Sequence, residues 1–212
     1  MPTNLWYNEI ELPFYGSVVD LSLAEARRYA SWYHEQTPVR IAILEAAVRS
    51  TPGYEDWRAD GTPDSLRVLG KWFSERVERR ELTEQEIANA RIKAGERFAA
   101  CVETWVLTRR TLSLAYDIGM YLGAVMVRAM PHLRWTLVEK GKRNADYHQP
   151  VLVASGYPVP MNPVTLVRVL ASGIADGTWG VKRLYELYDI WLDQLKPVTP
   201  GESADAPRCK EE

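Results

Sequence analysis

The chain has 212 residues, of which 46% are hydrophobic and 25% charged, and its formal net charge is −2. This length and composition are typical of a globular protein with one domain that buries its own core. The near-neutral charge argues against a general nucleic-acid binder and against a binder of anionic membranes, since both are usually basic. The two cysteines, Cys101 and Cys209, lie far apart and predict neither a disulfide framework nor a metal site.

Residues 1–19 are expected to form an extended arm that could add a strand to a sheet. This arm has no basic stretch followed by an apolar run, so no secretory signal is expected and a cytoplasmic location is the default. Its aromatic side chains are candidate anchors on the core: Trp6, Tyr7, Phe14 and Tyr15.

Cap signatures predict a helical N-terminal half over residues 20–100. Ser22 and Glu25 have the spacing of a capping box, which predicts a helix start. Thr37-Pro38 predicts a second, separate helix, because proline is favoured at the first helical position. That helix is expected to end at Thr51-Pro52-Gly53.

Two further helices are predicted before residue 100. Thr62-Pro63 repeats the cap-and-proline pattern. Thr83 and Glu86 form another capping-box pattern, which starts a long polar helix that is expected to reach about Ala100. The mixed charges of residues 79–97 indicate a face exposed to solvent.

The segment from Thr111 to Val127 is apolar on every side except at Asp117. A helix of that kind must be surrounded by protein or lipid. Because the run is shorter than the roughly 20 apolar residues of a membrane span, we interpret residues 109–130 as a central buried helix. Gly119 and Gly123 on this helix predict that another backbone crosses it closely.

The remainder of the chain predicts an α+β C-terminal half over residues 104–195. A segment rich in β-branched and aromatic residues, followed by a polar turn region and a second apolar segment, indicates a hairpin of strands 134–138 and 150–154, packed on the central helix. Asn162-Pro163 predicts the start of a helix that ends near Ile174. An amphipathic terminal helix follows, with apolar residues at spacings of three and four: Val181, Leu184, Tyr188, Trp191 and Leu195.

The predicted fold class is therefore α+β and mainly helical, with a small antiparallel sheet on a central buried helix. Residues 1–196 are expected to form a single globular domain. Residues 197–212 have the composition of a disordered tail.

Asp117 is the sharpest single candidate for chemistry. An acid within an apolar helix must be paired, protonated or bound to a ligand. One interpretation is a general acid or base, or a partner for a substrate cation. The favoured interpretation is a structural carboxylate that an arginine or a histidine neutralises.

A second hypothesis is a small-molecule site or active site in which Asp117, His132, His148 and Asn162 meet in one pocket. The histidines have no metal-ligand spacing, so we predict no metal site and no cofactor. Nucleophile-elbow, Walker and Rossmann motifs are also missing from the sequence.

The connection between the two predicted strands is locally basic. Its candidate partner-binding residues are Arg134, Lys140, Lys142 and Arg143, which could hold a phosphate or contact an acidic protein surface. The plainer interpretation, which is favoured, is that they keep an exposed loop soluble. The patch is too small for general nucleic-acid binding. Eight Trp and eleven Tyr against three Phe have two interpretations: the favoured one is a core rich in large rings, and the other is a binding surface, because these rings carry polar groups.

Three blocks of the second half carry a resemblance: TWVLTRRTLSLAYDIGMYLG, HLRWTLVEKGKRNADYHQPVLV and PMNPVTLV. They resemble bacterial hypothetical proteins, and their layout over residues 104–192 is similar to that of small α+β domains of immunity proteins from toxin systems. This resemblance implies a protein partner and carries over no catalytic or binding residue. The leading expectation is thus a cytoplasmic bacterial interaction domain, immunity- or adaptor-like, with no catalytic activity and no defined oligomeric state.

Overall fold

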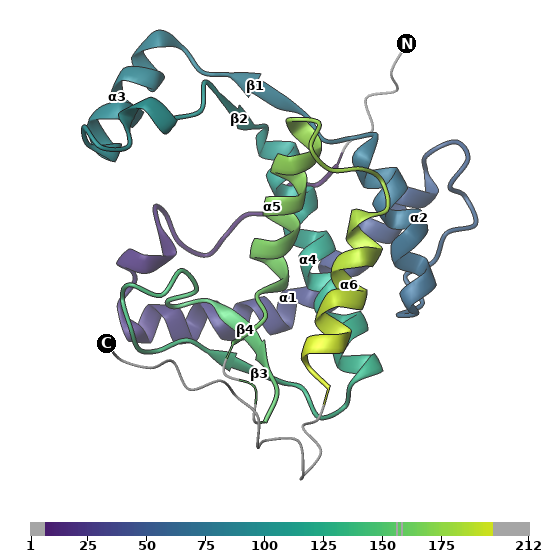
Figure 1. Ribbon diagram of the computed structural model, residues 1–212. Coiled ribbons are helices and arrows are strands. Elements are labelled where there is room, and N and C mark those ends of the chain that lie inside the picture. The colour runs from purple at the N-terminus through teal and green to yellow at the C-terminus, as the bar shows by residue number, and fades with distance from the viewer. Residues whose placement is uncertain (1–6, 156, 158, 197–212) are drawn as a thin grey trace, which may run out of the picture.

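The computed structural model describes residues 7–155, 157 and 159–196. Trp6 and the predicted tail over residues 197–212 lie outside the described residues. The architecture is α+β and mainly helical, as predicted, with two small antiparallel sheets (Figure 1). The elements are, in chain order, η1 (Val18–Asp20), α1 (Leu23–Arg49), α2 (Pro63–Ser74), β1 (Arg79–Glu81), α3 (Glu84–Ala94), η2 (Ala99–Cys101), β2 (Trp105–Leu107), α4 (Arg109–Ala129), β3 (Arg134–Leu137), β4 (Pro150–Val153), α5 (Pro163–Ala175) and α6 (Arg183–Gln194).

Helix α4 is the centre of the fold, which confirms the predicted buried helix. The side chain of Thr108 caps it by accepting a hydrogen bond from the Thr111 N–H. Fourteen of its residues are buried, from Thr111 to Met126. Helices α1, α5 and α6 surround it in Figure 1, and its contacts with α5 and α1 are the most extensive. No helix within the described residues is long and apolar enough to cross a membrane.

The two glycines of α4 lie where other elements cross it, as their spacing predicts. A Cβ atom on Gly119 would lie 2.6 Å from the Cα of Val164, at the start of α5. A Cβ on Gly123 would lie 2.7 Å from the indole of Trp135 on β3. Both positions therefore need glycine for close approach, and the second one places the hairpin on the central helix.

The predicted hairpin is confirmed with nearly the same bounds. Strands β3 and β4 pair antiparallel from Arg134 opposite Val153 to Leu137 opposite Pro150. Leu152 also forms a bridge with Met161, so the chain turns back along β4 before α5. Helices α5 and α6 follow as predicted, and Asn162 caps α5 by accepting from the Thr165 N–H at 3.0 Å.

The prediction of two separate helices before residue 50 was wrong. A single helix, α1, runs from Leu23 to Arg49 and contains Pro38. Because Pro38 has no N–H, the helical hydrogen bond to the carbonyl of His34 cannot form. Both residues are on the exposed side of the helix, where water can hydrate that carbonyl. The opposite face of the helix is buried both before and after the proline, and its buried residues are Ala26, Tyr29, Tyr33, Arg40, Leu44 and Val48.

The region between α2 and α4 also differs from the prediction. Helix α3 ends at Ala94 rather than near Ala100, because Gly95 adopts a φ of 76°. A second sheet, in which the short strands β1 and β2 pair antiparallel, was not predicted from the sequence. Figure 1 shows α3 held away from the other helices at the end of this ribbon. No residue of α3 is buried, which confirms the solvent-exposed face.

The N-terminal arm supplies no third strand over its described part, residues 7–17. It instead lies along α4, where the Ile10 N–H donates to Ser113 Oγ at 2.7 Å. Phe14 contacts Tyr29 edge to face, with the ring centroids 5.1 Å apart. The arm is thus held by contacts with helix side chains and not by the hydrogen-bond ladder of a strand.

Candidate functional site

The connection between β3 and β4 is an ordered loop. The Val138 N–H donates to Gln149 O, and the His148 N–H donates to Val138 O, which extends the hairpin ladder beyond the strands. Within the loop, the Asn144 N–H donates to Gly141 O at 2.7 Å. Asn144 Oδ1 in turn accepts from the Asp146 N–H at 2.9 Å. The backbone of the loop therefore has its own hydrogen-bond network.

Asn162 connects this loop to the start of α5. Its Nδ2 donates to Asp146 Oδ1 at 2.8 Å and to Gln149 Oε1 at 3.0 Å, while its Oδ1 caps the helix. Asn162 is 5% exposed, so these bonds are made in a dry environment that strengthens them. Its role is to position the loop on the body of the protein.

His148 is the other buried residue at the base of the loop. It has a φ of 63°, which is uncommon for a residue other than glycine. Its ring stacks on Tyr147, with the centroids 3.7 Å apart. Neither ring nitrogen has a hydrogen-bond partner among the described residues. The stacked pair fills the space beneath the loop and supports it from the core side.

Above this base, the loop exposes residues 139–145 to solvent. Its cations are Lys140, Lys142 and Arg143. Its one acid in that segment, Glu139, pairs with Arg27 of α1 at 2.9 Å. The hydrogen bond from Arg27 lowers the pKa of Glu139, so the carboxyl stays ionised and engaged. The structure thus brings three of the four predicted partner-binding residues into one positively charged loop, named here the basic loop (residues 139–145).

Arg134, the fourth predicted residue, is exposed at the opposite end of β3. It precedes residue 138 by four positions along the extended chain, which corresponds to about 13 Å. It therefore lies outside the basic loop.

Asp117 is engaged in contacts that stabilise the fold. Its carboxylate accepts from Arg40 Nε at 2.8 Å and from Arg40 Nη2 at 2.6 Å, and the Tyr7 hydroxyl also donates to it. Burial raises the pKa of Asp117, and the hydrogen bonds from Arg40 and Tyr7 oppose that shift. Burial likewise raises the pKa of Tyr7 well above its usual range, so its hydroxyl remains a donor. The acid is paired with an arginine, as favoured from the sequence.

Arg40 was not predicted from the sequence to be this partner. The available signal was its position on the buried stripe of α1, seven residues after Tyr33 and four before Leu44. A lone arginine on such a stripe requires a buried acid, and Asp117 is the acid within the apolar helix.

The four residues of the alternative pocket lie at three separate places, because only His148 and Asn162 are brought together. His132 Nε2 contacts Leu195 O at 2.8 Å, beyond the C-terminal end of α4. From Asp117 to that end of the helix the axis runs about 18 Å, at about 1.5 Å per residue. Asn162 and His148 hold the base of the basic loop instead. None of the four lines any of the cavities described below.

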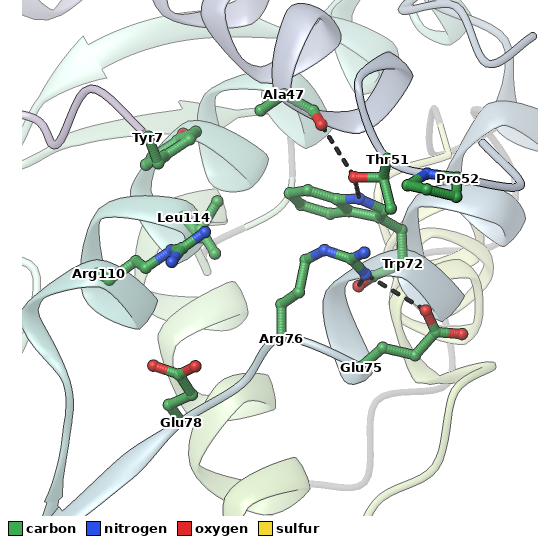
Figure 2. A pocket seen from close by; sticks show the side chains of 10 residues that line it. All are labelled: Tyr7, Ala47, Thr51, Pro52, Trp72, Glu75, Arg76, Glu78, Arg110 and Leu114. Atoms are coloured by element: carbon green, nitrogen blue, oxygen red, sulfur yellow. Dashed lines mark hydrogen bonds and ion pairs between the residues drawn. The ribbon is translucent and has the colours of Figure 1, made fainter. Parts of the chain in front are cut away.

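A cavity of about 280 Å³ lies between the ends of α1 and α2 and the start of α4 (Figure 2). The guanidinium of Arg76 lies 4.6 Å from the Trp72 ring and donates to Glu75. Figure 2 shows Arg110 and Glu78 on the opposite side from Trp72. Two guanidiniums and two carboxylates balance here, so the lining lacks the net charge that would select an ionic ligand. The cavity is lined by Tyr7, Ala47, Thr51, Pro52, Trp72, Glu75, Arg76, Glu78, Arg110 and Leu114.

Within the described residues, no group of three or more His, Cys, Asp or Glu side chains could hold a metal ion. Cys101 is exposed and free, and Cys209 lies outside the described residues.

No protein-family model matches this chain, and neither a curated protein nor a solved structure matches it. The resemblance to immunity-type domains gains no support from these comparisons. Any function must therefore be argued from the geometry of the molecule itself.

Proposed function

We propose that this protein binds a protein partner, and that its basic loop contacts an acidic segment of that partner. The observation that carries this proposal is that the loop is ordered. Its backbone hydrogen bonds and the hydrogen bond from Asn162 to Asp146 hold it in position, with three cations exposed. A loop that is already ordered loses less conformational entropy on binding than a mobile one. Its charge favours fast association with an acidic surface.

Binding of a protein partner in this way would suit an immunity or adaptor protein that acts in the cytoplasm. The small size of the loop suits a protein surface better than a long phosphate backbone, whose binding draws on many cationic contacts. The paired state of Glu139 supports this assignment, because its charge is compensated by Arg27 and does not cancel that of the lysines.

The test is capture of a partner from native lysate by the tagged full-length chain, quantified by mass spectrometry. The first variant reverses the loop charge with Lys140→Glu, Lys142→Glu and Arg143→Glu. The matched control makes the same charge change on α3 and the residues after it: Arg91→Glu, Lys93→Glu and Arg97→Glu, all exposed in the structure.

We expect one near-stoichiometric protein with the wild type and the control, and its loss with the loop variant. Binding of the purified pair should also weaken as salt concentration rises, because exposed charges are screened. Equal capture by the loop variant, with both variants folded by circular dichroism, would refute the proposal.

A further inference from the structure

A groove of about 450 Å³ lies between the N-terminal arm and the helices α1, α4 and α5. Its volume is within the range of small-molecule sites, about 300–1,000 Å³. Residues far apart in the sequence build it, because the arm lies across α4 and Phe14 packs on Tyr29. Most of its wall is apolar: Ile10, Leu12, Phe14, Val18, Leu112 and Val164.

Two tyrosines of this groove, Tyr29 of α1 and Tyr116 of α4, meet through their hydroxyl groups. Burial raises the pKa of Tyr29 to about 12 and that of Tyr116 well above its usual range. Both hydroxyls are therefore protonated at neutral pH. Two O–H groups share one hydrogen bond, so one proton of the pair has no acceptor among the described residues. A buried donor of this kind is costly unless an acceptor reaches it.

The cation beside this pair is Arg168 of α5. It lines the same groove as the two tyrosines, and its charge opposes the rise that burial causes in the pKa of Tyr29. Arg168 is exposed and has no ion-pair partner among the described residues. The other arginine of the groove, Arg109, already pairs with Glu9 at 3.3 Å. The groove thus carries one unmatched positive charge next to an unused hydrogen-bond donor.

We propose that this groove binds a small amphipathic carboxylate. The carboxylate pairs with Arg168 and accepts the free proton of the Tyr29–Tyr116 pair. The apolar tail of the ligand lies along the side chains of the arm, including Ile10 and Phe14. This site is separate from the basic loop, and the inference does not rest on the proposed protein partner.

The experiment is isothermal titration calorimetry of the full chain with defined probes. Octanoate represents an aliphatic acid and 3-phenylpropionate an aromatic one, and octan-1-ol is the uncharged control. We expect saturable one-to-one binding of at least one acid, and binding of the alcohol that is weaker by about tenfold or more, since it lacks the charged hydrogen bond. The better of the two acids identifies the tail that the groove prefers.

Arg168→Gln removes the cation from an exposed position, so the variant should fold as the wild type does. We expect it to weaken binding of the acid by about tenfold and to leave the alcohol unaffected. Arg91→Gln on α3 is the matched control, because it removes an exposed arginine from outside the groove. Absence of saturable binding by both acids, equal binding of the alcohol, or equal affinity in Arg168→Gln would each overturn the proposal.

Discussion

The guanidinium of Arg40 donates two hydrogen bonds to the carboxylate of Asp117, with N–O distances of 2.8 and 2.6 Å. Their side chains are 5% and 0% exposed, so the pair connects α1 to the central helix in a dry environment. A buried pair of this kind contributes little net energy relative to an apolar pair, but the loss of one partner leaves an uncompensated charge. The two residues therefore depend on each other.

Asp117→Asn should reduce the free energy of unfolding by about 3–5 kcal/mol, because Arg40 keeps its charge without a counter-ion. Equilibrium unfolding in urea measures this change. The exposed pair between Arg27 and Glu139 provides the control, and Glu139→Gln should cost under about 1 kcal/mol. The double variant Arg40→Leu/Asp117→Leu should be more stable than Asp117→Asn. A loss below about 1 kcal/mol for Asp117→Asn would contradict the structural role of the pair.

Gly119→Ala should destabilise the protein by about 1–3 kcal/mol, through overpacking. The new Cβ would lie 2.6 Å from Val164 Cα and 2.9 Å from Val164 N, and backbone atoms cannot give way as a flexible side chain can. Thermal unfolding measures the difference. Gly180→Ala is the control, since nothing lies within 4 Å of a Cβ there. If both substitutions had the same effect, α5 would not cross α4 as closely as described.

Pro38→Ala should stabilise the protein by about 1–2 kcal/mol. It restores a helical N–H in the interior of α1, while the unfolded chain gains some freedom that offsets part of the benefit. Pro63→Ala is the matched control, because Pro63 occupies the first turn of α2, where proline is favoured. Urea unfolding should show a gain for Pro38→Ala alone. A loss of stability in that variant would mean that α1 needs the proline.

Stability should fall as pH rises above about 10. In the unfolded chain Tyr29 ionises near its ordinary pKa of 10.0, whereas burial raises its pKa in the folded protein to about 12. Between these values the folded state binds more protons, so alkaline pH favours unfolding: the loss for this residue is about 1 kcal/mol at about pH 11 and reaches about 2–3 kcal/mol only above about pH 12. Below the lower value no such effect is expected.

Urea unfolding at about pH 9 and about pH 11 measures this loss. Tyr29→Phe removes the titrating group and should reduce the difference between the two conditions. A protein equally stable at both, or a variant with the same loss as the wild type, would show that ionisation of Tyr29 does not contribute.

Local signals account for the elements that were predicted correctly. The capping residues Ser22, Thr83 and Asn162 each accept the expected hydrogen bond in the first turn of a helix. Such bonds connect residues three positions apart, so neighbours in sequence are enough to specify them. The hairpin was visible for the same reason, since strand alternation and turn residues are local features.

The errors lie where local and tertiary preferences conflict. Thr37-Pro38 has the sequence of a helix start, but the buried stripe on both sides of it packs on the core and holds one continuous helix. The strands β1 and β2 have only three residues each and pair across α3, so neither shows a period long enough to recognise.

The composition of one segment was enough to predict that α4 is buried, that it holds one acid, and that its glycines admit a crossing backbone. Which partners those residues meet depends on the packing of the helices. Arg40 is 77 positions from Asp117, and Tyr29 is 87 positions from Tyr116. Contacts of that kind depend on how helices pack, since side-chain packing and not chain proximity selects which polar groups share a buried space.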